Sequence, residues 1–141
     1  IKQAIEVAAK AVKNGYHPFA CIVIDPSGKV VWKDHNKVKK TFDPTSHGEI
    51  NAVRHLCKKL KTLSLKGYVF YTTSEPCPMC FTVMNNAQVS AVYFGASFHP
   101  TQFLPISAKK LAKYAKKYPI KVTGGILKDE CLRQREKLWK R

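Results

Sequence analysis

The sequence predicts a single α/β domain over residues 1–141, with helices on both faces of a sheet. Short apolar or β-branched runs alternate with longer segments of helical periodicity, which is the pattern of that class. A length of 141 residues suits one compact domain, and an apolar content of 45% is enough for one core. No uninterrupted apolar run reaches the length of a membrane span, so a membrane partner is not expected.

The expected elements follow from local patterns in chain order. Residues 1–15 carry an apolar stripe of helical spacing that ends at Gly15. Two apolar runs, 19–25 and 29–34, are joined by Pro26-Ser27-Gly28 and are expected to form a hairpin. Further helices are expected over residues 43–60, 77–87, 107–118 and 127–141, and further strands over residues 67–73, 89–96 and 120–125.

Positive charge dominates the composition, with 25 basic residues against nine acidic ones and a net charge of +16. Such a field favours anionic partners, including nucleic acid. A solvated lysine surface explains it equally well, because arginine, the residue preferred for phosphate and base contacts, is scarce. In the lysine-rich helix expected over residues 107–118, Ser107 is the expected N-cap, and the expected buried face consists of Leu111, Tyr114, Ala115 and Tyr118.

Five cysteines at irregular spacing argue against a disulfide framework and favour a reducing, cytoplasmic setting. Cys77 and Cys80 form a C-x-x-C pair between a predicted strand and a predicted helix. A helix N-terminus stabilises thiolates, which suits metal binding and suits a redox pair as well. A structural four-cysteine zinc site is disfavoured because a second C-x-x-C is missing from the sequence.

Thirty residues before Cys77, His47 and Glu49 stand at another predicted helix start. One imidazole and two thiolates give zinc three ligands and leave the fourth position open for water, which is the pattern of a catalytic site. Glu49 could complete the deprotonation of that water and carry the proton onward. Alternatively, Ser46-x-x-Glu49 matches a capping box, in which the glutamate only closes the helix end.

The two halves together match the H-x-E…P-C-x-x-C signature of zinc deaminases, as His47-Gly48-Glu49 and Pro76-Cys77-Pro78-Met79-Cys80. The chain resembles the cytidine and deoxycytidylate deaminase superfamily, and more narrowly its branch of guanine deaminases, nucleoside deaminases and tRNA adenosine deaminases. The blocks that carry the resemblance are HPFACIVI, DPTSHGEINAVR, TTSEPCPMC, VYFGAS and VTGGILKDECL. The resemblance implies a three-layer α/β/α cytidine-deaminase-like fold around a mixed five-stranded sheet, and a homodimer.

The same resemblance implies a role for individual residues. His47, Cys77 and Cys80 correspond to the zinc ligands and Glu49 to the proton shuttle, with Zn²⁺ as the cofactor. Three further residues are implied to lie beside the substrate. They are Asn36, as a hydrogen-bonding partner of the base, Phe19, as a stacking residue, and Gly48, which replaces the usual alanine and is expected to loosen the backbone there. The alternatives for Asn36 and Phe19 are a turn residue and ordinary core packing.

The resemblance implies hydrolysis, in which zinc-activated water attacks the amino-bearing ring carbon and ammonia departs. A free purine base or nucleoside, of the guanine type, is the favoured substrate, and a tRNA adenosine is the alternative. A third hypothesis is a non-catalytic zinc-stabilised binding module, against which the intact Glu49 argues. Guanine deaminases commonly hold guanine with an acidic side chain after the fourth strand, whereas this chain has none between Glu75 and Asp129.

Overall fold

The computed structural model describes residues 1–98 and 103–139. Its sheet contains β1 (Ala20–Ile24), β2 (Val30–His35), β3 (Val69–Ser74), β4 (Ala91–Ala96) and β5 (Lys121–Thr123). The helices are α1 (Lys2–Lys13), α2 (Val38–Thr41), α3 (Gly48–Leu60), α4 (Pro78–Asn86), α5 (Ala108–Ala112) and α6 (Lys128–Leu138).

The sheet is mixed, with the strand order β2-β1-β3-β4-β5. The strand β1 is antiparallel to both β2 and β3, which confirms the predicted hairpin. The pairs β3–β4 and β4–β5 are parallel, so their connections must cross a face of the sheet, and helices α4 and α5 make these crossings. The hairpin turn is held by the Asp25 carboxylate, which accepts hydrogen bonds from the backbone N–H groups of Ser27 and Lys29.

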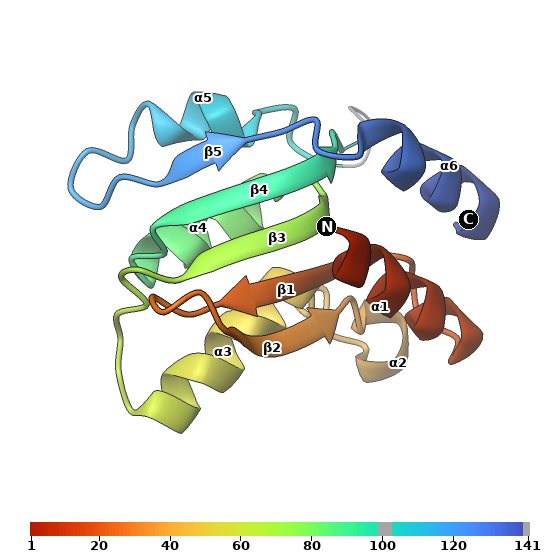
Figure 1. Ribbon diagram of the computed structural model, residues 1–141, viewed down its shortest axis with the longest axis horizontal. Helices are drawn as coiled ribbons and strands as arrows, with labels where there is room; N and C mark the ends of the chain where they lie inside the picture. Colours follow the sequence, from red (N-terminus) through yellow and green to blue (C-terminus); the bar gives the residue numbers. More distant parts are fainter. Residues whose placement is uncertain (99–102, 140–141) are drawn as a thin grey trace.

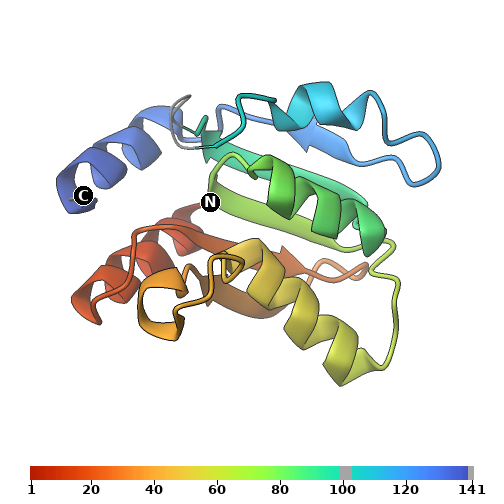
Figure 2. The same ribbon diagram turned by 180° about the vertical axis from the view of Figure 1, so that it is seen from behind.

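Helices cover both faces of the sheet. Figure 1 shows α1 and α6 on the near face, and Figure 2 shows α3, α4 and α5 on the opposite face. This arrangement is the three-layer α/β/α architecture that the sequence predicted. Within residues 1–98 and 103–139, none of the helices combines the length and the apolar character that a membrane crossing needs.

The larger core lies between the sheet and the helices α3 and α4. Phe70 and Val92 from the central strands are fully buried, and they belong to one cluster with Leu56 of α3 and Met84 of α4. Burial of such side chains stabilises a fold by roughly 1.5–3 kcal/mol each. The core therefore fixes α3 and α4 against the strands and, with them, the positions of their N-terminal ends.

The expected buried face of the lysine-rich segment is wrong in part. Ser107 is the N-cap, and its side-chain oxygen accepts a hydrogen bond from the Lys110 N–H, as predicted. The helix α5 nevertheless ends at Ala112, and Tyr114 is 76% exposed in the turn that follows. Closely spaced lysines repel one another along a helix, and the segment has no acidic residue to offset them.

Candidate active site

The candidate metal ligands converge at the ends of two helices on the same side of the sheet. His47 Nδ1 lies 3.4 Å from Cys80 Sγ and 3.7 Å from Cys77 Sγ, and the three ligand atoms lie within 4.8 Å of one another. His47 is the N-cap residue of α3 and Cys77 is the N-cap residue of α4. The structure therefore brings together the three residues that the motifs predicted.

The local backbone explains this convergence. Both N-cap residues have extended backbone, with φ and ψ of −75° and 153° at His47 and −67° and 166° at Cys77. Pro78 occupies the first turn of α4, where a missing N–H costs no helical hydrogen bond. Cys80 lies one helical turn after Cys77 and is fully buried. Because residues three apart share one side of a helix, the C-x-x-C spacing places both sulfur atoms near the imidazole.

The donor set fits zinc. Hydrogen bonds from Cys80 and from His47 lower the pKa of the Cys77 thiol to about 4, so that Cys77 carries a negative charge at neutral pH. The contact with Cys77 and burial raise the pKa of Cys80, whose proton a bound metal would displace. An imidazole nitrogen with two sulfur ligands is a three-ligand set of the kind that catalytic zinc sites use.

Glu49 lies in the first turn of α3 and is 9% exposed. Burial raises the pKa of its carboxyl group above the ordinary value, and the nearby His47 partly offsets that effect. The capping-box alternative is wrong, because the N-cap is His47 and the Ser46 hydroxyl donates instead to Asn51 Oδ1, at 2.9 Å. Glu49 therefore does not form a capping box with Ser46.

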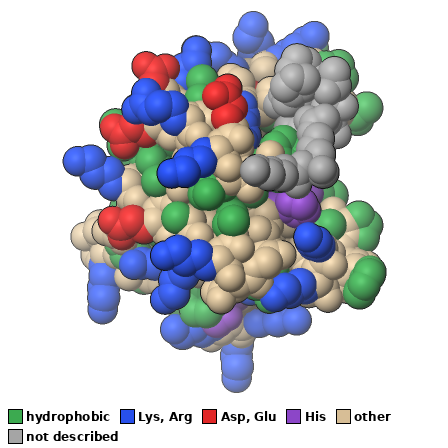
Figure 3. Space-filling model, turned by 90° about the vertical axis from the view of Figure 1, so that its right-hand side faces the viewer, with side chains coloured by type: hydrophobic (Ala, Val, Ile, Leu, Met, Phe, Trp, Pro, Cys, Tyr) green, Lys and Arg blue, Asp and Glu red, His purple; other side chains and the backbone are tan. Residues whose placement is uncertain are grey.

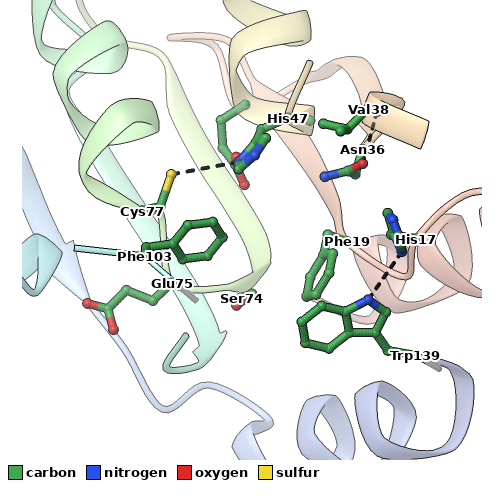
Figure 4. Close-up of a pocket in the computed structure, with 12 residues that line it drawn as sticks. His17, Phe19, Asn36, Val38, His47, Ser74, Glu75, Cys77, Phe103 and Trp139 are labelled. Carbon is green, nitrogen blue, oxygen red and sulfur yellow. Dashed lines mark hydrogen bonds between the residues drawn. The ribbon is translucent and has the colours of Figure 1, made fainter. Parts of the chain in front are cut away.

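A cavity of about 250 Å³ opens beside this cluster, slightly below the usual range of roughly 300–1,000 Å³ for small-molecule sites. Figure 4 shows the cavity with His47 and Cys77 at one end and Phe19 and Trp139 at the other. Its lining includes every predicted site residue except the fully buried Cys80; the predicted members are Phe19, Asn36, His47, Gly48, Glu49 and Cys77.

Asn36 and Phe19 stand at the open ends of the β1–β2 hairpin, where the Asn36 N–H donates to the Phe19 carbonyl at 2.9 Å. The Asn36 side chain is oriented by its oxygen, which accepts a hydrogen bond from the Val38 N–H at 3.1 Å. Its nitrogen points into the cavity (Figure 4). Asn36 therefore presents a hydrogen-bond donor to whatever occupies the cavity.

Gly48 allows a close approach between α3 and the end of β2. A Cβ at this position would lie 3.2 Å from the Cα of His35, which is tighter than ordinary van der Waals contact. The same junction is fastened by Asn51, whose Nδ2 donates to the His35 carbonyl at 3.0 Å. Glycine at position 48 thus sets how near the hairpin end, and with it Asn36, comes to the metal ligands.

The sequence analysis did not single out several residues that line the cavity, among them three with aromatic rings: His17, Phe103 and Trp139. His17 and Trp139 flank Phe19 at the far end, and Phe103 stands beside the ligands, with its ring centroid 5.8 Å from that of His47. Trp139 follows α6, a helix rich in charged residues. The available signal was a lone tryptophan at the end of a charged helix, where burial of its ring is the expected use.

Glu75 also lines the cavity, but its carboxylate has another partner. Its Oε2 accepts a hydrogen bond from the Ala108 N–H at 2.9 Å, at the start of α5. In Figure 4 the carboxylate points away from Asn36 and Phe19. Glu75 therefore fixes the loop between β3 and α4 to the start of α5.

Comparison with known proteins places this site in a family. The model of the cytidine and deoxycytidylate deaminase zinc-binding region matches residues 1–96, which hold all the predicted site residues. A tRNA-specific adenosine deaminase of Haemophilus influenzae is 29% identical over 131 residues, which is 93% of this chain and 76% of that protein. A guanine deaminase of Bacillus subtilis is 34% identical over 97 residues, or 68% of this chain and 62% of that protein.

Solved structures agree with these relatives. A structure from studies of A-to-I editing by tRNA:A34 deaminases superimposes with a TM-score of 0.83 at 25% identity, covering 94% of this chain and 96% of the other. A guanine deaminase of Nitrosomonas europaea has the same fold, with a TM-score of 0.83 at 21% identity, covering 97% of this chain and 81% of that one. With a family match over most of its length and a His-Cys-Cys group suited to zinc, this chain belongs to the cytidine and deoxycytidylate deaminase family and is a zinc-dependent deaminase.

Proposed function

We propose that the chain hydrolyses the exocyclic amine of a free purine base or purine nucleoside and releases ammonia. The observation that carries this proposal is a single cavity that joins the His47, Cys77 and Cys80 cluster to the buried carboxyl group of Glu49. Asn36 and the aromatic far end supply a donor and a flat surface in the same cavity. These are the groups that a planar, amino-bearing heterocycle needs for recognition.

The residues divide the work as follows. Zinc, when held by His47, Cys77 and Cys80, supplies a Lewis acid that activates a water molecule. Glu49 takes a proton from that water and gives it to the ring nitrogen, while the water oxygen bonds to the amino-bearing carbon. Glu49 then passes the second proton of the water to the amine, the C–N bond breaks, and ammonia leaves. The ring keeps a carbonyl group in place of the amine.

Among small molecules, we favour an aminopurine of the guanine type as the substrate. Guanine itself tests this choice, because it needs hydrogen-bond acceptors in the cavity. Guanine presents a ring N–H and an amino group as donors. The carboxylates among the described lining residues are Glu49, which is assigned to the proton transfers, and Glu75, which bonds to Ala108. Comparison of guanine with adenine therefore reports which donors the cavity accommodates.

The second candidate is a tRNA adenosine. The net charge of +16 supports it, and basic side chains are spread across the face in Figure 3, whereas acidic side chains gather at one side. The relative from Haemophilus influenzae also supports it. Polynucleotide binding falls steeply with salt because it releases counterions, whereas turnover of a neutral base changes little.

The deciding experiment measures ammonia release by the zinc-loaded protein from guanine, adenine, cytosine, their nucleosides and a tRNA anticodon stem-loop, at low and high salt. We expect the highest kcat/KM on a free purine or its nucleoside, with little dependence on salt. Activity confined to the stem-loop and abolished by salt would favour the tRNA candidate. Zinc binding without ammonia release from any substrate would favour a non-catalytic module. The homodimer and the cytoplasmic setting stay predictions.

A further inference from the structure

The far end of the cavity is built by a contact between the two ends of the described chain. The ring of Trp139 meets that of Phe19 edge-on, with centroids 5.0 Å apart and planes at 80°. The indole Nε1–H of Trp139 donates to His17 Nδ1 at 3.1 Å, across a separation of 122 residues. All three side chains line the cavity, and Figure 4 shows them together.

Hydrogen bonds on two sides of α6 place Trp139. Gln134 Nε2 donates to the Ile5 carbonyl of α1 at 2.7 Å, and Arg135 donates to the Ser97 carbonyl after β4 at 2.8 Å. Burial, and secondarily the charge of Lys39, lower the pKa of His17. A neutral imidazole can accept the indole hydrogen bond, which leaves its other ring nitrogen as the N–H donor.

The arrangement of the cavity fixes how a base must lie in it. The reacting carbon has to sit at the end that holds His47, Cys77 and Glu49. A ring that stacks on Phe19 then extends toward Trp139. Because the planes of Phe19 and Trp139 stand at 80° to each other, such a ring meets Trp139 with its edge. Trp139 is thus placed as an end wall and limits the length of the occupant.

We propose that Trp139 is a specificity-determining residue, an end wall that admits a free purine base and disfavours one carrying a sugar. The proposal rests on the proposed function in so far as the occupant is a nucleobase. It narrows that function from bases and nucleosides to bases. It also assigns a substrate contact to a residue that lies outside residues 1–96, the part of the chain matched by the family model.

The kinetic test compares Trp139→Ala with Trp139→Phe, using adenine and guanine and their nucleosides. Trp139→Ala shortens the wall and should raise the ratio of nucleoside to base kcat/KM by about tenfold or more, since a pocket discriminates by roughly that factor per small group. Trp139→Phe keeps a ring but loses the donor to His17, and the ratio should stay near that of the parent protein. An unchanged ratio in Trp139→Ala would overturn the proposal.

A binding test works without turnover. The chain has two tryptophans, and the other, Trp32, stacks on His55 of α3 with centroids 3.4 Å apart. In zinc-loaded Glu49→Gln protein that also carries Trp32→Phe, the emission comes from Trp139 alone. Adenine or guanine should change that emission saturably, whereas their nucleosides should need roughly tenfold higher concentration. The matched protein with Trp139→Phe and an intact Trp32 should show no response.

The outcomes separate this inference from the proposed function. A saturable, base-selective response of Trp139 in the Glu49→Gln protein, together with no ammonia release by the parent protein with intact Glu49, would support the wall and refute the deaminase reaction proposed for these substrates. Ammonia release from bases with an unresponsive Trp139 would support the reaction and overturn the wall. If Trp139→Ala fails to fold, Trp139→Leu provides the shortened wall, and the same change in ratio is expected.

Discussion

The two ends of the cavity are built in opposite ways. At the metal end, His47 and Cys77 are N-cap residues of helices that the core holds against the sheet, and the ligand atoms lie within 4.8 Å of one another. At the far end, His17 and Trp139 meet through a side-chain hydrogen bond and an edge-on ring contact across 122 residues of chain. The first end combines local backbone geometry at two helix starts with the packing of both helices in the core, whereas the second depends on how the segment after α6 docks on the segment after α1.

This difference predicts how each end responds to mutation. A change at the metal end should remove chemistry, because the groups there are the proposed zinc ligands and the proposed proton carrier. A change at the far end or at the hairpin alters recognition and leaves the chemistry in place. The division between kcat and KM effects should therefore follow position along the cavity.

The largest effect is expected from Cys77→Ala and His47→Ala. Each removes one of three ligands, so zinc content should fall from about one per chain toward zero, and turnover should fall by about 10⁴-fold or more. Zinc is measured by elemental analysis, and folding by circular dichroism. Cys57→Ala is the matched control, because this half-buried cysteine lies near the C-terminal end of α3, away from the metal cluster. Full zinc occupancy in both variants would show that His47 and Cys77 are not zinc ligands.

Glu49→Gln should separate metal binding from proton transfer within the same end. The amide has nearly the same shape, so zinc content and thermal stability should stay close to those of the parent protein. Turnover should fall by about 10²–10⁴-fold, the usual contribution of a general acid–base group. Glu130→Gln, at an exposed acid in the first turn of α6, is the control for loss of charge. Near-normal ammonia release by Glu49→Gln would leave the proton transfers without a carrier.

Asn36 tests the middle of the cavity, where recognition and orientation meet. Asn36→Asp keeps an oxygen that accepts the Val38 N–H but loses the donor that points into the cavity, whereas Asn36→Ala loses both. If the Asn36 N–H group donates to the base, both variants should lose roughly 10- to 100-fold in kcat/KM. In each variant the acceptor atom of the bound base is left without a hydrogen-bond partner. Retention of activity in Asn36→Asp alone would show that only the turn matters.

Gly48→Ala should have a small effect on substrate binding, because it shifts the hairpin end relative to the metal ligands. The added methyl group would press on the His35 backbone from 3.2 Å, so the hairpin end must move by a few tenths of an ångström. We expect a loss of stability of about 1 kcal/mol and a several-fold rise in KM with zinc content unchanged. Thermal melting and steady-state kinetics measure both quantities. A rise in stability with unchanged KM would show that the junction accommodates the methyl group.

The smallest effect concerns His17 at the far end. Burial and the charge of Lys39 lower the pKa of His17 in the folded protein below its ordinary value. The unfolded chain therefore binds a proton more readily, and the stability contributed by neutral His17 declines as pH falls below about 6.5. In His17→Gln, melting curves should lose that part of the pH dependence. If the melting temperature of both proteins fell equally below about pH 6.5, His17 would not be the source of that pH dependence.

The sequence predicted which residues meet at the metal end, for two reasons. A strand followed by P-C-x-x-C at a helix start leaves little freedom for Cys77 and Cys80, and the H-x-E…P-C-x-x-C signature indicates His47 as their partner although it lies 30 residues away from Cys77. Other long-range contacts belong to no such signature. Two such contacts are the hydrogen bond between Glu75 and Ala108 and the contacts of Trp139. Both depend on how separate elements pack together, and such packing produces no repeating pattern in the sequence.

The lysine-rich segment shows a second reason for failure. Spacing alone suggested a helix that would bury Tyr114, but the helix α5 stops after five residues. Periodicity records which residues could share a face, whereas the length of a helix is also decided by charge repulsion and by packing against its neighbours. The hairpin was predicted correctly because turn residues and apolar runs agreed with each other.

The docking of α6 has a consequence for how such proteins diverge. The proposed metal ligands lie at the starts of α3 and α4. Trp139 instead follows α6, which is hydrogen-bonded to α1 and to the segment after β4. A lineage could therefore replace the residue at position 139, or tilt α6, while it inherits the catalytic machinery intact.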